Sequence, residues 1–232
     1  SAHSRDEMIY TRDFREESDA PVDLGEDASV AGVLETTGDT DTFRFDLVEK
    51  RFVTITPTAR ALGSPVIPRL RLTDTSGDVI AETPADLFEE QPLRLWLDPG
   101  SGYRLSIRDA FGRSGRECRY HLEVDRKAVP FELSAQGQRD KKHPLPDKFV
   151  AVPGGLFDIP VQCHRHQFDP AIDLGVESSW GCRGEAGQIA GKQGHGNLRV
   201  RLPHHGEAGH LRHVWVSGRA GLDGREFESH LQ

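Results

Sequence analysis

The chain has 232 residues, with 37 acidic and 29 basic side chains and a formal net charge of −8. This balance argues against nucleic acid as a partner, because binding to phosphates favours a basic surface. The sequence contains no run of about 18 apolar residues, so it predicts no membrane span. Its length is typical of one or two domains of roughly 100–150 residues each.

The first half of the chain alternates apolar and polar side chains over short stretches between turn signals. The first 20 residues are polar and charged, and we expect only a short strand there, at residues 8–10. Further strands are predicted at residues 29–34, 43–46, 52–56, 69–74, 79–82, 93–97, 103–109 and 120–124. Many short strands without a helical stripe are typical of an antiparallel β-sandwich.

A second series of strands follows a polar linker near residues 125–130. These strands are predicted at residues 131–134, 148–152, 156–161, 172–176, 197–202 and 213–218, with a glycine-rich polar loop at residues 184–196. The fold class is therefore predicted to be all-β, with two consecutive antiparallel β-sandwich domains. We place these domains at residues 1–127 and 128–232, the second of immunoglobulin-like size.

An acidic turn at residues 38–42 is the best candidate for a metal site. Asp39 and Asp41 lie two residues apart and can converge on one ion, and calcium binds six to eight oxygen ligands. We expect Glu17, Asp19 and Asp109 to complete the set. The alternative is a solvated acidic turn that caps a hairpin.

The second half contains a group of cysteine and histidine residues. Cys163, His164, His166 and Cys182 are ligand types that zinc prefers. On a strand, however, Cys163 would face one side and the two histidines the other. Two alternatives remain, namely a Cys163–Cys182 disulfide that stabilises by about 3 kcal/mol, or buried free thiols beside surface histidines.

The three tryptophans differ in their surroundings. Trp180 lies in a predicted loop, where it could anchor a sugar ring or a protein partner, or cover one end of the sandwich. Trp96 and Trp215 lie within alternating strands. We therefore predict that Trp96 and Trp215 belong to the core.

Several ordered motifs of the first half resemble the bacterial pre-peptidase C-terminal domain, a small jelly-roll-like sandwich that follows secreted peptidases. The match covers roughly residues 25–125. The motifs are Val-Ala-Gly-Val-Leu at residues 30–34, Gly-Asp-Thr-Asp-Thr-Phe-Arg-Phe at 38–45, Leu-Gly-Ser-Pro at 62–65, the strand and turn at 70–77, and Pro-Gly-Ser-Gly-Tyr at 99–103 with its strand to 109. The resemblance implies an accessory domain, and some members bind calcium through an acidic lead-in and the Asp-x-Asp turn.

The second half is similar to immunoglobulin-like modules that follow such domains in large exported proteins of planctomycete-type bacteria. The residues that carry this likeness are 152–155, 159–161, 165, 168–169, 171–176, 209 and 216–220. The pairing implies a fragment of a longer protein that is secreted or held in the cell envelope.

These features predict a non-catalytic accessory module that serves adhesion, substrate targeting or domain spacing, and not an enzyme. Its expected partners are a carbohydrate or an extracellular protein surface, and other domains of the parent protein, bound by loops on a rigid scaffold. The alternative is a small metal-dependent hydrolase that uses the His/Cys-rich second domain. The sequence contains no Gly-x-Ser-x-Gly motif and no phosphate-binding Gly-Lys-Ser/Thr motif.

Overall fold

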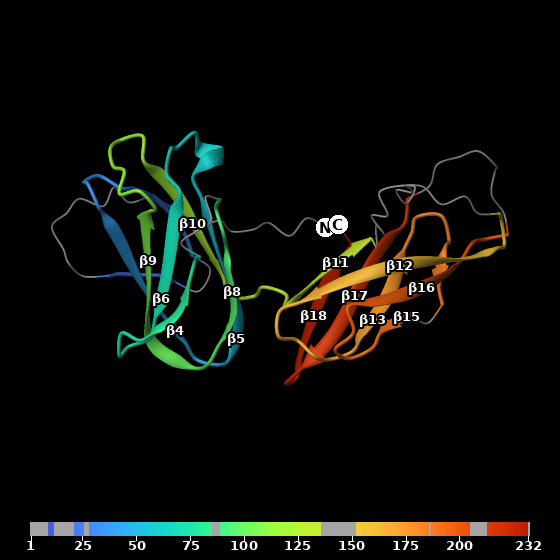
Figure 1. Cartoon of the computed structure of the whole chain (residues 1–232). Helices are drawn as coiled ribbons and strands as arrows, with labels where there is room; N and C mark the ends of the chain where they lie inside the picture. The colour runs from blue at the N-terminus through green and yellow to red at the C-terminus, as the bar shows by residue number, and fades with distance from the viewer. Residues whose placement is uncertain are drawn as a thin grey trace. The chain divides into compact units, whose positions relative to one another are not determined.

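The computed structural model describes residues 9–11, 21–25, 28–84, 89–135, 152–185, 187–204 and 213–231. The chain divides into two compact units, unit 1 at residues 1–128 and unit 2 at residues 129–232. The described residues form strands and one short 3-10 helix, η1 (Arg60–Leu62), which confirms the all-β prediction (Figure 1). Among them, no helix has the length and apolar character needed to cross a membrane.

Unit 1 consists of two five-stranded sheets. Its first sheet has the order β1 (Ile9–Thr11), β3 (Ala28–Val33), β10 (Arg119–Asp125), β5 (Arg51–Thr58) and β8 (Leu93–Leu97). Its second sheet has the order β2 (Val22–Asp23), β4 (Thr40–Leu47), β9 (Gly100–Asp109), β6 (Pro68–Thr73) and β7 (Val79–Glu82). Neighbouring strands are antiparallel except for the short pairs β1–β3 and β2–β4.

The core of unit 1 follows from the alternation of its strands. In β4, Phe43 and Phe45 are buried and Arg44 between them is exposed. In β9, Leu105 and Ile107 are fully buried in the same way. These side chains form one cluster with buried residues of the first sheet, so the two sheets share a single core.

Unit 2 consists of two four-stranded sheets whose strand pairs are all antiparallel. One sheet has the order β11 (Phe131–Ala135), β12 (Leu156–Arg165), β16 (His195–Arg201) and β14 (Arg183–Gly184). The other has the order β15 (Gly187–Ile189), β13 (Ile172–Glu177), β17 (Trp215–Leu222) and β18 (Arg225–His230). The ring of Phe168 packs on Phe131 at 5.5 Å and against Phe227 at 5.6 Å.

The prediction of a loop at residues 184–196 is wrong, because this stretch contains Gly184 of β14, all of β15 and the start of β16. Its glycines allow close approach between strands. A Cβ atom on Gly187 would lie 2.8 Å from Leu198, and one on Gly196 would lie 2.9 Å from Ile189. Strand β18 was not predicted, because five of its six residues are polar or charged. The strand predicted at residues 148–152 falls almost entirely outside the described residues.

A packing test is available at Gly32, which pairs with Tyr120 across β3 and β10. A Cβ atom at Gly32 would lie 2.3 Å from the Tyr120 hydroxyl oxygen, whereas one at Gly25 would meet no atom within 4 Å. We expect Gly32→Ala to lower the free energy of unfolding by about 1–3 kcal/mol, as overpacking does. Gly25→Ala should change it by less than about 0.5 kcal/mol. Equal urea midpoints for both variants would contradict this packing.

Candidate functional site

The acidic turn of unit 1 is held by hydrogen bonds to the main chain. The carboxylate of Asp39 accepts a hydrogen bond from the Glu35 amide at 2.7 Å and from its neighbour, the Thr40 amide, at 2.8 Å. Gly38 provides the left-handed backbone conformation, with φ of +79°. Each Asp39 oxygen therefore has a structural partner in this turn.

Asp41 connects the two sheets of unit 1. Its Oδ2 accepts a hydrogen bond of 2.5 Å from the hydroxyl of Tyr120, a fully buried residue of β10. Burial raises the pKa of Asp41 to about 6, and the nearby carboxylates Asp39 and Glu35 act in the same direction. The hydrogen bond from Tyr120 partly offsets this rise in pKa.

Asp109 closes the loop that follows β9. The residue is 2% exposed, and its Oδ1 accepts hydrogen bonds from the Ile67 amide at 2.8 Å and Arg113 Nη2 at 2.9 Å. Its Oδ2 accepts from the Phe111 amide and from the amide and Nε of Arg113, at 2.8–3.0 Å. Burial opposes ionisation, but these hydrogen bonds outweigh it and lower the pKa of Asp109 to about 2.

The described residues do not fit a calcium site by themselves. The turn at Gly38 contacts Gly112 by a main-chain hydrogen bond of 3.3 Å, so Asp39, Asp41 and the Asp109 loop lie at one end of unit 1. However, the oxygens of Asp39 and Asp109 already accept amide or guanidinium hydrogens. No group of three His, Cys, Asp or Glu side chains among the described residues is arranged to hold a metal. Glu17 and Asp19 lie outside those residues.

The Cys/His group of unit 2 is divided between two sides of β12, as the alternation predicts. Cys163 is buried, while His164 is exposed and its ring lies 4.7 Å from that of His166. Cys163 and Cys182 are separate free thiols, and burial raises the pKa of both. His166 contacts Glu132 at 3.5 Å.

An aromatic patch on unit 2 is the candidate binding site. Trp215 is 57% exposed, so its prediction as a core residue is wrong. The physical reason is that β17 buries the adjacent Val216, which turns Trp215 outward. Trp180 is half-buried, and its Nε1 donates a hydrogen bond of 2.9 Å to the carbonyl of His213. The rings of His213 and Trp215 lie 6.4 Å apart.

We use the name aromatic patch for Trp180, His213 and Trp215. The loop that carries Trp180 is fixed by Ser178, whose Oγ accepts a hydrogen bond of 2.9 Å from the Cys182 amide. Cys182 is itself buried and anchors the end of this loop. Trp96, in contrast, is half-buried and packs on Phe52 at 5.6 Å.

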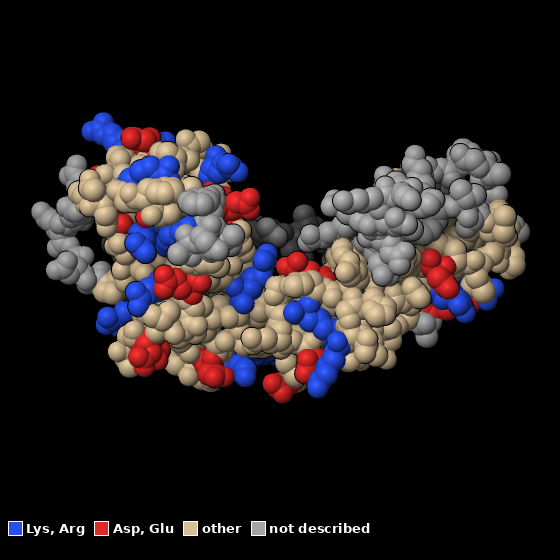
Figure 2. All heavy atoms as spheres, in the orientation of Figure 1, with Lys and Arg blue, Asp and Glu red and all other residues tan. Residues whose placement is uncertain are grey.

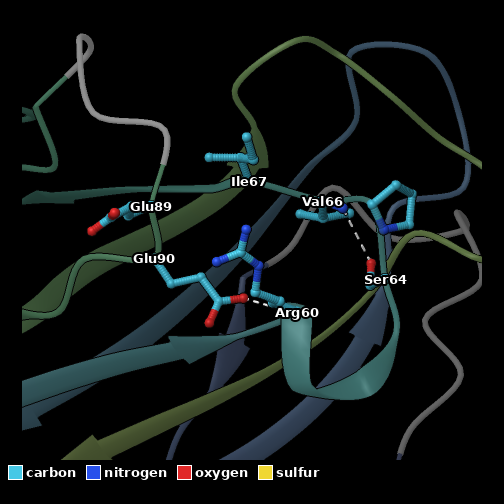
Figure 3. Close-up of a pocket in the computed structure, with 7 residues that line it drawn as sticks. Arg60, Ser64, Val66, Ile67, Glu89 and Glu90 are labelled. Carbon is cyan, nitrogen blue, oxygen red and sulfur yellow. Dashed lines mark hydrogen bonds between the residues drawn. The ribbon is translucent and has the colours of Figure 1, made fainter.

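Unit 1 also has a surface pocket of about 530 Å³ beside η1 (Figure 3). It is lined by Arg60, Ser64, Pro65, Val66, Ile67, Glu89 and Glu90. Glu90 Oε1 accepts hydrogen bonds from the amides of Ala59 at 2.7 Å and Arg60 at 2.5 Å. The Glu90 carboxylate therefore caps the short helix. Sequence reasoning did not single out this pocket, because residues 59 and 90 are far apart in the chain.

Comparison with known proteins finds similar solved structures. No protein-family model matches the chain, and no curated protein matches it. One similar structure is the pre-peptidase C-terminal domain of collagenase from Bacillus anthracis, with 18% identity and a TM-score of 0.37, over 48% of this chain and 100% of that one. Another is an FMN-binding β-glucuronidase from Facaelibacterium prausnitzii L2-6, with 11% identity and a TM-score of 0.36. That match covers 85% of this chain and 33% of the glucuronidase.

The raised pKa of Asp41 predicts a specific pH dependence. Because the folded state binds this proton more tightly than the unfolded state, stability should fall as the pH rises from about 4 to about 6. Asp41→Asn cannot ionise and keeps an oxygen that can accept from Tyr120. Above pH 6 we expect this variant to be more stable than the wild type by about 1–2 kcal/mol, a value discounted for partial exposure.

Urea unfolding of both proteins between about pH 4 and pH 8 measures this difference. Asp23→Asn, which removes an exposed carboxylate on β2, serves as the matched control and should leave the pH profile unchanged. Parallel profiles for wild type and Asp41→Asn would show that Asp41 does not titrate in this range.

Proposed function

We propose that this chain is a non-catalytic binding module of a larger exported bacterial protein, and that it contacts carbohydrate through the aromatic patch of unit 2. The observation that carries the proposal is the 57% exposure of Trp215. Its ring lies 6.4 Å from that of His213, whose carbonyl accepts the hydrogen bond from Trp180. The C–H groups on one face of a sugar ring pack well against an aromatic ring, because the face of the ring is electron-rich.

The size of the exposed surface supports this role. A tryptophan side chain has roughly 200 Å² of surface, and burial contributes about 25 cal/mol per Å². Covering the exposed 57% of Trp215 would therefore contribute up to about 3 kcal/mol. This is an upper bound, because association itself costs free energy.

Hydrogen bonds within unit 2 also hold the loop that carries Trp180. Ser178 closes the loop of Trp180, and the indole hydrogen bond ties this loop to the residues before β17. Preorganisation lowers the entropy cost of binding. Glu177, which pairs with Trp215 across β13 and β17, places an exposed carboxylate beside the patch for contact with sugar hydroxyls.

The remainder of the proposal concerns the parent protein. Unit 1 would act as a domain of the pre-peptidase C-terminal type and unit 2 as an immunoglobulin-like module, in a protein that is secreted or held in the envelope. The ordered motifs at residues 25–125 support the first part. The division into two compact units supports a role in spacing or presenting domains.

Loss of the tryptophans tests the binding proposal. We expect Trp215→Ala and Trp180→Ala each to weaken binding to a neutral oligosaccharide by about tenfold or more, measured by titration calorimetry after an array of neutral glycans has identified a ligand. Phe111→Ala removes another exposed aromatic ring, which is 61% exposed on unit 1, and should leave affinity unchanged. Equal affinity of all three variants, or no binding of wild type to any neutral glycan, would overturn the carbohydrate proposal.

We further propose that calcium binds unit 1 through Asp39 and Asp41 together with Glu17 and Asp19 of the lead-in. Calcium up to about 10 mM should then raise the melting temperature of metal-stripped protein, because extracellular calcium modules bind at about 0.1–1 mM. Asp39→Ala and Glu17→Ala should each abolish the shift, whereas Asp23→Ala should retain it. A wild-type melting temperature that does not respond to calcium would reject this site.

A further inference from the structure

The outer face of the second sheet of unit 1 carries a group of arginines. Because the apolar residues of β4, β6 and β9 point into the core, the residues between them face outward. Four of these outward residues are exposed arginines, and we name them the arginine face: Arg44, Arg71, Arg104 and Arg108. In Figure 2, basic side chains are spread over the part of unit 1 where β9, β6 and β4 lie in Figure 1, with acidic side chains beside them.

The strand register brings these arginines close together. Arg44 on β4 lies directly opposite Arg104 on β9, and Arg71 on β6 lies opposite Ser106, between Arg104 and Arg108. Arg108 is in turn opposite Arg69, a fifth arginine, which is 7% exposed and donates to the carbonyl of Pro84. Like charges directly opposite each other across strands are unfavourable. The fold therefore maintains this face at some cost in stability.

Acidic side chains compensate this face only at its margins. Arg44 lies 3.9 Å from both Asp23 and Asp46, and Glu82 is opposite Arg71 on the edge strand β7. Within the described part of the chain, no ion pair is formed by Arg71, Arg104 or Arg108.

Arginines of unit 2 are paired quite differently. Arg199 binds Asp158 at 2.8 Å, and Arg219 binds Glu228 at 2.9 Å. Among the described residues, the absence of such pairs at Arg71, Arg104 and Arg108 stands out in a chain whose acidic residues outnumber its basic ones by 37 to 29. This face is thus left available for anionic groups from outside the chain.

Hydroxyl groups lie between the arginines. The outward residues of the same strands include Thr40, Thr42, Thr73 and Ser106. Hydroxyl side chains both donate and accept hydrogen bonds, as sugar hydroxyls do. The guanidinium fork matches a carboxylate or sulfate oxygen pair. Adjacent strands are about 4.8 Å apart, and Arg104 and Arg108 are separated by about 13 Å along β9.

We propose that the arginine face binds an acidic polysaccharide, a polymer whose sugars carry carboxylate or sulfate groups beside free hydroxyl groups. The alternating arginines and hydroxyls on a broad sheet surface match this pattern of charge. A nucleic acid fits less well, because a duplex carries one charge per about 1.7 Å and would meet the carboxylates at the margins of the face. This site is separate from the aromatic patch, in another unit and with different chemistry.

The test uses the full chain with two matched triple variants. The face variant is Arg71→Gln/Arg104→Gln/Arg108→Gln. The control variant is Arg94→Gln/Arg116→Gln/Arg119→Gln, which removes three exposed arginines from the first sheet of unit 1 and the loop before β10. Both variants lose the same charge. The probes are heparin and polygalacturonate, with uncharged dextran and a short DNA duplex for comparison, and affinity is measured at several salt concentrations.

We expect wild type and the control variant to bind heparin or polygalacturonate with affinity that falls as salt rises. The face variant should lose this affinity by about tenfold or more. Its melting temperature should equal or exceed that of wild type, because repulsion across the strands is removed.

Three results would overturn the proposal: equal loss in both triple variants, no binding of either acidic polysaccharide by wild type, or tighter binding of wild type to DNA than to both polysaccharides. Trp215→Ala should leave heparin binding unchanged, so failure of this site and failure of the aromatic patch can be told apart.

Discussion

The burial of alternate side chains determines which residues β4, β9 and β17 present to solvent. In β4, burial of Phe43 and Phe45 forces Arg44 outward, and in β9 the burial of Leu105 and Ile107 does the same for Arg104 and Arg108. In β17 the buried residue is Val216, so Trp215 faces solvent. A shift of register by one residue would exchange the two faces of a strand. The core of each sandwich therefore fixes the chemistry of its outer surface.

Two carboxylates of unit 1 show how the same group acquires opposite properties from its surroundings. Asp41 is bound by one neutral hydroxyl and lies near other carboxylates, so burial dominates and its pKa rises to about 6. The side chain of Asp109 is less exposed than that of Asp41. The guanidinium of Arg113 and three amides nevertheless lower the pKa of Asp109 to about 2. Both carboxylates stabilise loops or join sheets. An acidic turn in a sequence therefore does not reveal the role of its carboxylates, since the same residues can hold a loop by hydrogen bonds or bind a metal.

The strands with regular alternation, such as residues 69–74 and 120–124, were predictable because one apolar face suffices to identify them. Strand β15 could not be predicted. Its glycine allows neighbouring strands to approach closely, but in a sequence the same residue indicates a turn. Strand β18 was not recognised because it contains charged residues, which lie at the edge of a sheet.

The aromatic patch could be predicted only in part. Trp180 was identified from its loop, but the orientation of Trp215 depends on which neighbour is buried. The arginine face depends on the register between β4, β6 and β9, and this register cannot be read from the sequence of any one strand.

The most direct test of the proposed carbohydrate contact is an NMR titration that follows the three tryptophan indole N–H signals. The chain has three tryptophans, and each signal is assigned by single substitution. A neutral oligosaccharide bound at the aromatic patch should shift the signals of Trp180 and Trp215 together, with one saturating dissociation constant, and leave that of Trp96 unchanged. Shifts confined to Trp96, or saturable binding with no change at Trp180 and Trp215, would contradict the account.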